Sequence, residues 1–167
     1  MERTDLPPAW DERTMLQTFL DYTRDTAVMK CADLGDEAAR ATPLPGSPLM
    51  SIAGVVNHLR WVEHSWIEVR FLGGQDRGPW TDEEPDREFS IVTELSLAEV
   101  IDGYRTTSAR CDALVADVDL DVRARSPIRS GDLVTLRWIM HHLIEETARH
   151  NGHLDLLREM ADGTTGD

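Results

Sequence analysis

Glu146 and His150 are the residues whose types and spacing most clearly suggest chemistry. They stand four residues apart in a segment, LRWIMHHLIEETARHNGHLDLLREM (136–160), whose apolar pattern predicts a helix. Residues four apart on a helix are neighbours, with their Cβ atoms about 5–6 Å from each other. A carboxylate and an imidazole at this spacing can bind one metal ion, and His58 in another predicted helix is a candidate third ligand.

The apolar pattern places this pair in or beside a buried helix face. Glu146, His150 and His153 fall inside or at the edge of the stripe made by Leu136, Ile139, Met140, Leu143, Thr147, Leu154 and Leu157. His58 lies beside a similar stripe in its own segment. A buried carboxylate needs a cation, a hydrogen-bond partner or a shifted pKa, which favours a shared metal. Two other interpretations stay open: a hydrogen-bonded core histidine, and a Glu/His pair that occurs by chance on a solvated face.

Length and charge restrict the class of protein. The 167 residues are most simply one domain, residues 1–167, with a core of its own. The net charge of −14 argues against a nucleic-acid partner, because Lys and Arg supply most of the affinity for phosphates. The N-terminal segment has no apolar signal-peptide core, and no stretch approaches the roughly 18 apolar residues of a membrane span. We therefore expect a cytoplasmic protein without a membrane partner.

Two further compositional features concern the source and the thiols. Lys30 is the only lysine among 17 basic residues, and this arginine bias is consistent with a GC-rich, actinobacterial genome. Cys31 and Cys111 both fall on apolar stripes, without a CxxC partner or a flanking base. We expect both to be buried, reduced thiols and not ligands or nucleophiles.

Four segments have the pattern of long amphipathic helices, and together they predict an all-α four-helix bundle. The third begins with a capping box at Ser96 and Glu99, and the fourth ends before Gly163. The connections at about 35–50, 73–95 and 119–134 are irregular, with residues 89–92 a weak strand candidate. The long second connection means that a simple up-down-up-down path is not required. The predicted helices cover about 11–34, 51–72, 96–118 and 135–162.

Several short motifs resemble the DinB-like superfamily, specifically its actinobacterial branch that includes mycothiol-dependent enzymes. The motifs are Asn57-His58-Leu59, the segment WVEHSW at 61–66, Leu136-Arg137-Trp138 and, most specifically, residues 145–164. The resemblance extends from Asp11 to Thr164. It implies a four-helix bundle, often of up-down-down-up topology, with a divalent metal held by three side chains in the interior.

The resemblance also implies which residues hold the metal. Most members of the superfamily use three histidines, whereas a His, Glu, His set is the pattern of the mycothiol-dependent maleylpyruvate isomerase branch. The implied ligands here are His58, Glu146 and His150, with zinc the expected ion and nickel or another divalent metal the alternative. That isomerase has a further C-terminal domain contributing to its active site, and this chain ends at Asp167, so we do not expect isomerase activity.

These residues together lead to a functional expectation. A three-ligand site leaves a coordination position open, so the ion can activate a bound thiol. We expect an S-transferase that uses mycothiol or a similar small thiol to attack an electrophile, with His153 as general acid or base. His153 could instead be a fourth ligand, a donor to a ligand or a structural histidine. The rival functions are a metal-dependent hydrolase and a non-catalytic, metal-binding stress or interaction protein that forms a homodimer through its helix faces.

Polar and aromatic neighbours of the candidate ligands are expected to be structural. We expect His142 to be hydrogen-bonded and His64 to face solvent or an interface. Arg149 is expected to form a surface salt bridge. Solvated charges or helix-surface ion pairs are expected at Glu63, Glu68 and Glu145. Bundle core or dimer surface is expected at Trp61, Trp66 and Trp138.

Overall fold

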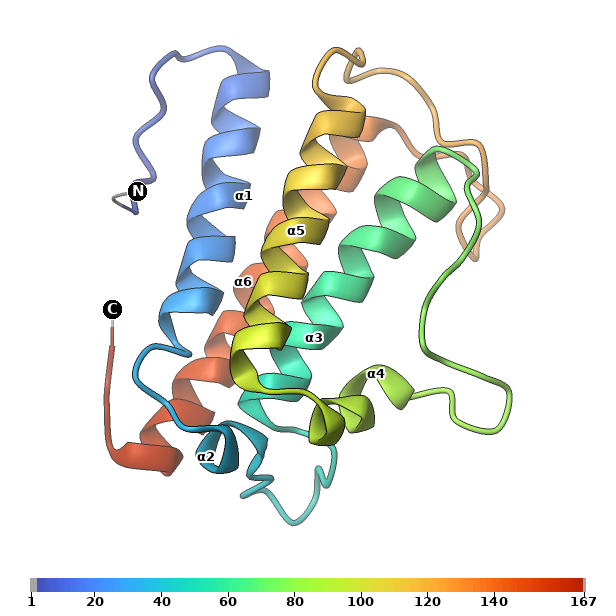
Figure 1. The fold of residues 1–167 in the computed structure, drawn as a ribbon. Coiled ribbons are helices and arrows are strands. Elements are labelled where there is room, and N and C mark those ends of the chain that lie inside the picture. Colours follow the sequence, from blue (N-terminus) through green and yellow to red (C-terminus); the bar gives the residue numbers. More distant parts are fainter. Residues whose placement is uncertain (1–2, 167) are drawn as a thin grey trace.

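The computed structural model describes residues 3–166 as a bundle of helices (Figure 1). The predicted all-α class is confirmed, because extended pairing within this part of the chain is limited to one β-bridge between Arg123 and Thr135. Met1, Glu2 and Asp167 of the predicted single domain lie outside the described residues, and the single-domain assignment stays a prediction. The long helices are α1 (Glu12–Met29), α3 (Ile52–Glu63) with its continuation η1 (His64–Phe71, a π-helix), α5 (Leu97–Val115) and α6 (Leu136–Asp162). The short ones are α2 (Asp36–Arg40), α4 (Arg87–Ser90) and the 3₁₀-helix η2 (Ile91–Glu94).

Helices α1 and α6 run in one direction, and α3 and α5 run in the other (Figure 1). At the level of their first turns, the Arg137 guanidinium of α6 donates to the Glu12 carboxylate of α1 at 2.7 Å. Towards their other ends, the Arg158 side chain of α6 donates to the Lys30 carbonyl at 3.0 Å. In the view of Figure 1, the chain therefore runs down α1, up α3 and α5, and down α6. The segment between η1 and α5 travels back along the bundle before α5 begins (Figure 1).

Side-chain caps determine where the long helices begin. The capping residue of each accepts a hydrogen bond from the backbone N–H three residues later, which satisfies one of the free donors of the first turn. The predicted capping box is confirmed, since the Ser96 N–H also donates to Glu99 Oε2 at 2.8 Å. Gly163 ends α6 with a φ of 77°, a left-handed conformation that suits glycine. The four caps are Asp11, Ser51, Ser96 and Thr135.

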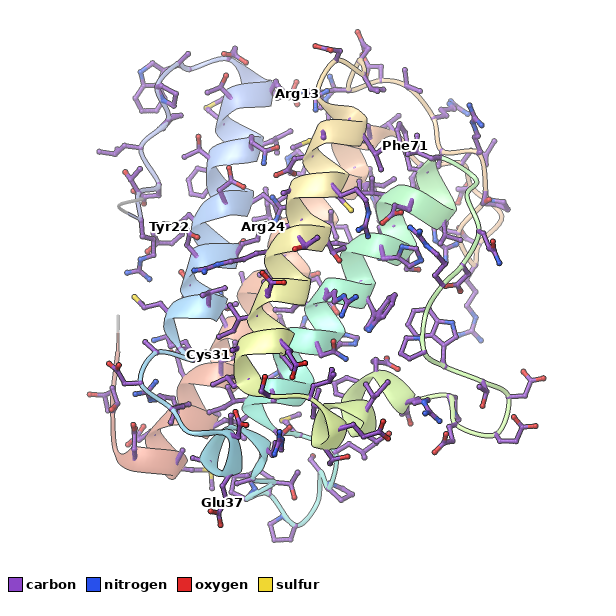
Figure 2. All side chains as sticks on the ribbon, in the orientation of Figure 1. Arg13, Tyr22, Arg24, Cys31, Glu37 and Phe71 are labelled. Atoms are coloured by element: carbon purple, nitrogen blue, oxygen red, sulfur yellow. The ribbon has the colours of Figure 1, made fainter. Side chains whose placement is uncertain are left out.

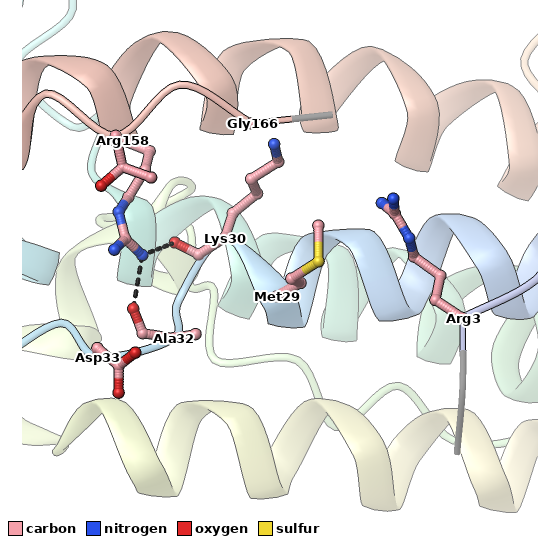
Figure 3. Close-up of a pocket in the computed structure, with 8 residues that line it drawn as sticks. Arg3, Met29, Lys30, Ala32, Asp33, Arg158 and Gly166 are labelled. Carbon is pink, nitrogen blue, oxygen red and sulfur yellow. Dashed lines mark hydrogen bonds between the residues drawn. The ribbon is translucent and has the colours of Figure 1, made fainter.

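The predicted end of the first helix and the strand candidate at residues 89–92 were wrong. We predicted that the first helix extends to about residue 34, but α1 ends at Met29. Arg158 of α6 donates to the carbonyls of Lys30 and Ala32 at 3.0 and 2.6 Å, so these groups are satisfied without another helical turn (Figure 3). Residues 89–92 are helical and not a strand, because the Asn57 side chain of α3 donates to the Glu88 carbonyl at 2.6 Å and ties this segment to the bundle.

A polar level separates two apolar clusters along the bundle. Arg24 of α1 (labelled in Figure 2) donates through Nε and Nη2 to the two carboxylate oxygens of Glu63 at 2.8 and 2.7 Å. Ser108 of α5 donates to the same carboxylate at 3.1 Å, and Asp112 accepts from Arg24 Nη1 at 2.8 Å. Thr147 of α6 is buried at this level. All four long helices therefore contribute a polar residue between the clusters.

Glu63, Glu68 and His64 were predicted to lie on the helix surface, at an interface in the case of His64 or in contact with solvent. This was wrong, because their exposed fractions are 1%, 9% and 1%. Glu63 comes four residues after Leu59 and thus continues the core stripe of α3, where Arg24 neutralises it. His64 and Glu68 lie in the π-helix. Its i→i+5 hydrogen bonds widen each turn, so side chains there leave the faces that a 3.6-residue period predicts. Glu145 is exposed as predicted.

Cys31 and Cys111 are buried free thiols, as predicted. Burial raises the pKa of Cys31 to about 12 and also raises the pKa of Cys111 well above its usual range. Because the thiolate is the reactive form, we expect neither cysteine to react with Ellman's reagent in the native protein at pH 8. Both should react at once in guanidinium chloride. Labelling of either thiol under native conditions at the rate of a free cysteine would contradict this prediction.

Candidate metal centre

The antiparallel packing of α3 against α6 brings the three predicted ligands together. His58 Nε2 lies 3.6 Å from Glu146 Oε1, and His150 Nε2 lies 3.2 Å from the same oxygen. One ligand atom from each of the three residues lies within 4.8 Å of the other two, and all three residues are half-buried. The spacing of Glu146 and His150 within one helix, and the register of α3 against that helix, therefore produce a compact set of two nitrogen donors and one oxygen donor.

The His58 ring is held between two residues that sequence reasoning missed. Phe89 stacks on it with 4.7 Å between ring centroids and 18° between planes. Glu88 is buried, and its Oε1 lies 3.5 Å from His58 Nδ1. A carboxylate beside one imidazole nitrogen favours a proton there and leaves the other nitrogen, Nε2, free as a ligand. No sequence signal could have found this pair, because residues 73–95 show no periodicity that would place α4 on α3.

His150 has the properties of a neutral imidazole. Burial lowers its pKa below the ordinary histidine value, and the nearby His58 lowers it further, while Glu146 acts in the opposite direction. The lowered pKa favours the neutral imidazole, which is the form that binds metals. His153 Nδ1 lies 3.3 Å from His150 Nδ1, so one of these nitrogens must carry the hydrogen between them.

This donor set suits a divalent ion of the zinc type. Two imidazoles and one carboxylate form the three-ligand arrangement of catalytic zinc sites, which leaves a position for water or substrate. An ion would also compensate the charge of the Glu146 carboxylate, whose Oε1 lies beside the two imidazoles. The neighbouring Glu145 instead pairs with Arg149 on the surface, as predicted.

The remaining histidines of these helices lie outside the cluster. His64 Nε2 accepts a hydrogen bond from the Arg77 N–H at 3.1 Å, and its Nδ1 lies 3.1 Å from Glu68 Oε1. This histidine therefore fastens the segment after η1 to the bundle. His142 stacks on Trp138, which is 43% exposed, and meets Trp66 edge-on. Trp138 thus belongs to the surface as much as to the core.

We expect Glu88→Gln to weaken zinc binding about 10- to 100-fold, the usual effect of removing a carboxylate that supports a histidine ligand. The amide keeps the shape of the side chain but lacks the charge that favours the proton on His58 Nδ1. Competition with a chelating dye would measure the dissociation constant. Glu83→Gln, at an exposed position in the same segment, is the matched control. Equal affinities for wild type and Glu88→Gln would show that this carboxylate does not support His58.

Comparison with known proteins identifies the family of this chain. A family model described as mycothiol S-transferase matches residues 15–163. The chain belongs to the mycothiol S-transferase family. The matched range begins in α1, includes all three cluster residues and His153, and ends at the residue that caps α6. No curated protein matches the chain at a significant level. Among residues 3–166, no helix is both long enough and apolar enough to cross a membrane.

Proposed function

We propose that this member of the mycothiol S-transferase family is a metal-dependent S-transferase. In this proposal His58, Glu146 and His150 hold a divalent ion, preferably zinc, and mycothiol is the thiol substrate. The observation that supports it is the coincidence of the family match with a compact His, Glu, His cluster inside the matched range. A divalent ion with an open position lowers the pKa of a thiol that binds it, and so supplies a sulfur nucleophile at neutral pH.

The surrounding residues favour the ring orientation and the neutral form that the histidines need to bind a metal ion. Glu88 and Phe89 fix the orientation of the His58 ring. Burial lowers the pKa of His150 and so favours its neutral form, and Glu146 Oε1 lies close to both imidazoles and supplies negative charge for a dication. All three residues are half-buried and not enclosed, so a small thiol can approach them from solvent.

His153 has two competing roles, and its catalytic assignment stays a prediction. If His150 uses Nε2 as the ligand atom, its Nδ1 carries a hydrogen and donates to His153 Nδ1. His153 then acts as a positioning residue for His150, and its remaining hydrogen lies on Nε2. If His153 instead accepts the proton of the thiol, this hydrogen bond must first break. His153→Ala should weaken metal binding in the first case. In the second case it should leave the metal in place, slow transfer, and be partly rescued by imidazole in the buffer.

A direct test uses mycothiol and 1-chloro-2,4-dinitrobenzene with zinc-loaded protein. The sulfur forms a bond to the ring carbon that carries chlorine, the carbon–chlorine bond breaks, chloride leaves with the electron pair, and the thiol proton passes to a base or to buffer. We expect formation of the thioether, measured by absorbance and mass spectrometry, to exceed the uncatalysed rate. Chelation should abolish the excess and zinc should restore it. His141→Ala, at an exposed position on α6, should behave as wild type.

A second measurement separates the proposal from its rivals. Mycothiol added to cobalt-substituted protein should produce an intense sulfur-to-metal charge-transfer band in the near ultraviolet. If acetate or azide changes the cobalt spectrum but thiols do not, and an ester substrate is cleaved without thiol, the protein is a hydrolase. If metal binds with neither thiol binding nor turnover, the protein is a non-catalytic metal-binding protein.

A further inference from the structure

A mostly apolar hollow of about 290 Å³ opens beside the candidate metal centre. Its floor and walls come from the connection before α3, from α3 itself, from the start of α4 and from α6. His150 is one of its lining residues, so the hollow reaches the metal cluster directly. Phe89 is another, and the same ring stacks on His58. The other lining residues are Ser47, Pro48, Leu49, Met50, Val55 and Asp86.

The charges around this hollow disfavour an anionic ligand. Within the part of the chain that the structure describes, its lining contains no arginine or lysine, and Asp86 adds a negative charge. The carboxylates of Glu88 and Glu146 lie 3.2–3.6 Å from the ring nitrogens of His58 and His150. The nearest arginines in the sequence, Arg87 and Arg149, form ion pairs with Glu84 and Glu145. A carboxylate held in the apolar part of the hollow, away from the cluster, would therefore lose hydration without gaining a cationic side chain as partner.

The size of the hollow fits a substituted ring. A cavity of about 150 Å³ lined by aliphatic side chains is known to hold a benzene molecule. A volume of about 290 Å³ therefore leaves room for ring substituents while keeping the ring against Leu49, Met50 and Phe89. The contact with His150 places one edge of such a ligand at the cluster, where a nucleophile would be held.

We propose that this hollow binds the apolar, uncharged part of the electrophilic substrate, and that it selects neutral aryl or alkyl electrophiles over carboxylate-bearing ones. This inference rests on the proposed S-transferase function, because it assigns the second substrate of that reaction. Leu49 is the most accessible determinant: it lines the hollow, is 41% exposed and can be replaced without opening the core.

The test uses a matched pair of electrophiles, methyl 4-chloro-3,5-dinitrobenzoate and the corresponding free carboxylate. Mycothiol displaces chloride from both, and each enzymatic rate is divided by the uncatalysed rate for the same compound. We expect wild-type protein to favour the ester by about tenfold or more in kcat/KM. Leu49→Arg should reduce this preference to about unity or reverse it, because it places a cation in the hollow. Leu156→Arg, with Leu156 60% exposed on α6 and outside the hollow, should keep the wild-type preference.

A binding measurement makes the result independent of turnover. Methyl 3,5-dinitrobenzoate and 3,5-dinitrobenzoate lack the leaving group, so equilibrium dialysis against metal-free protein reports the hollow alone. Preference for the ester in wild type, lost in Leu49→Arg and kept in Leu156→Arg, supports the proposal even if no thiol transfer occurs, in which case the proposed function fails separately. Equal binding of ester and acid by wild type overturns the proposal. An unchanged preference in folded Leu49→Arg protein also overturns it, even if thiol transfer is observed.

Discussion

Glu146→Ala is expected to remove nearly all tightly bound divalent metal from the protein. Glu146 is the only charged donor of the cluster, and without it two neutral imidazoles would have to hold a dication. Because removal of a supporting carboxylate alone costs about 10- to 100-fold in affinity, we expect loss of this ligand to cost more. His58→Ala and His150→Ala should behave in the same way. The measurement is the metal-to-protein ratio by plasma mass spectrometry, on protein purified without a metal-affinity tag.

The control for this prediction is His141→Ala, which removes an exposed imidazole from the same helix. Zinc should also raise the melting temperature of the wild type, since an ion that binds only the folded state contributes about 2.7 kcal/mol at a free concentration a hundredfold above its dissociation constant. This zinc-dependent shift should be absent in the three ligand variants and present in His141→Ala. Stoichiometric metal in all three ligand variants would refute the assignment.

Arg24→Met is expected to lower the free energy of unfolding by about 3–5 kcal/mol, as is typical when one partner of a buried ion pair is removed. The variant leaves the Glu63 carboxylate, 1% exposed, without its guanidinium partner, although the Ser108 hydroxyl still donates to it. Urea denaturation would measure the loss. Arg149→Met breaks an exposed ion pair and should change stability little. The double variant Arg24→Met/Glu63→Met should be more stable than Arg24→Met, because no uncompensated charge remains.

Arg24→Met should also change the pH dependence of stability. In the wild type, burial already raises the pKa of Glu63, and Arg24 opposes the rise. Without Arg24, the folded-state pKa moves further above the unfolded value, so the folded state binds a proton at a pH where the unfolded state does not. The contribution of Glu63 to the unfolding free energy should therefore increase as the pH falls from 7 towards 5. A steady loss of stability over this range, equal to that of wild type, would contradict a charged carboxylate buried at this position.

Local patterns were sufficient to predict the parts of the structure that depend on one helix. The four-residue spacing of Glu146 and His150 and the capping box of Ser96 and Glu99 are properties of single helices, and the sequence displays them directly. The burial of Glu63 could also have been predicted, because this residue comes four residues after Leu59 on the core stripe. The burial of His64 and Glu68 could not be predicted in this way, because both lie in a π-helix, and no local residue pattern in the sequence indicates one. Glu88 depends on how residues 73–95 return across the bundle, which no local periodicity encodes.

The polar level has a consequence for how the helices are aligned lengthwise. An apolar interface alone tolerates sliding by one helical turn, about 5.4 Å, because one aliphatic contact can replace another. A slide of α3 along α1 would instead separate Glu63 from Arg24 and leave both charges against hydrocarbon. Helix α6 is fixed to α1 in turn, because Asn151 donates to the Thr23 carbonyl at 2.9 Å. The ion pair thus fixes the lengthwise register of α3 against α1, and the Asn151 hydrogen bond fixes that of α6 against α1. Together they determine that His58 on α3 lies opposite Glu146 and His150 on α6.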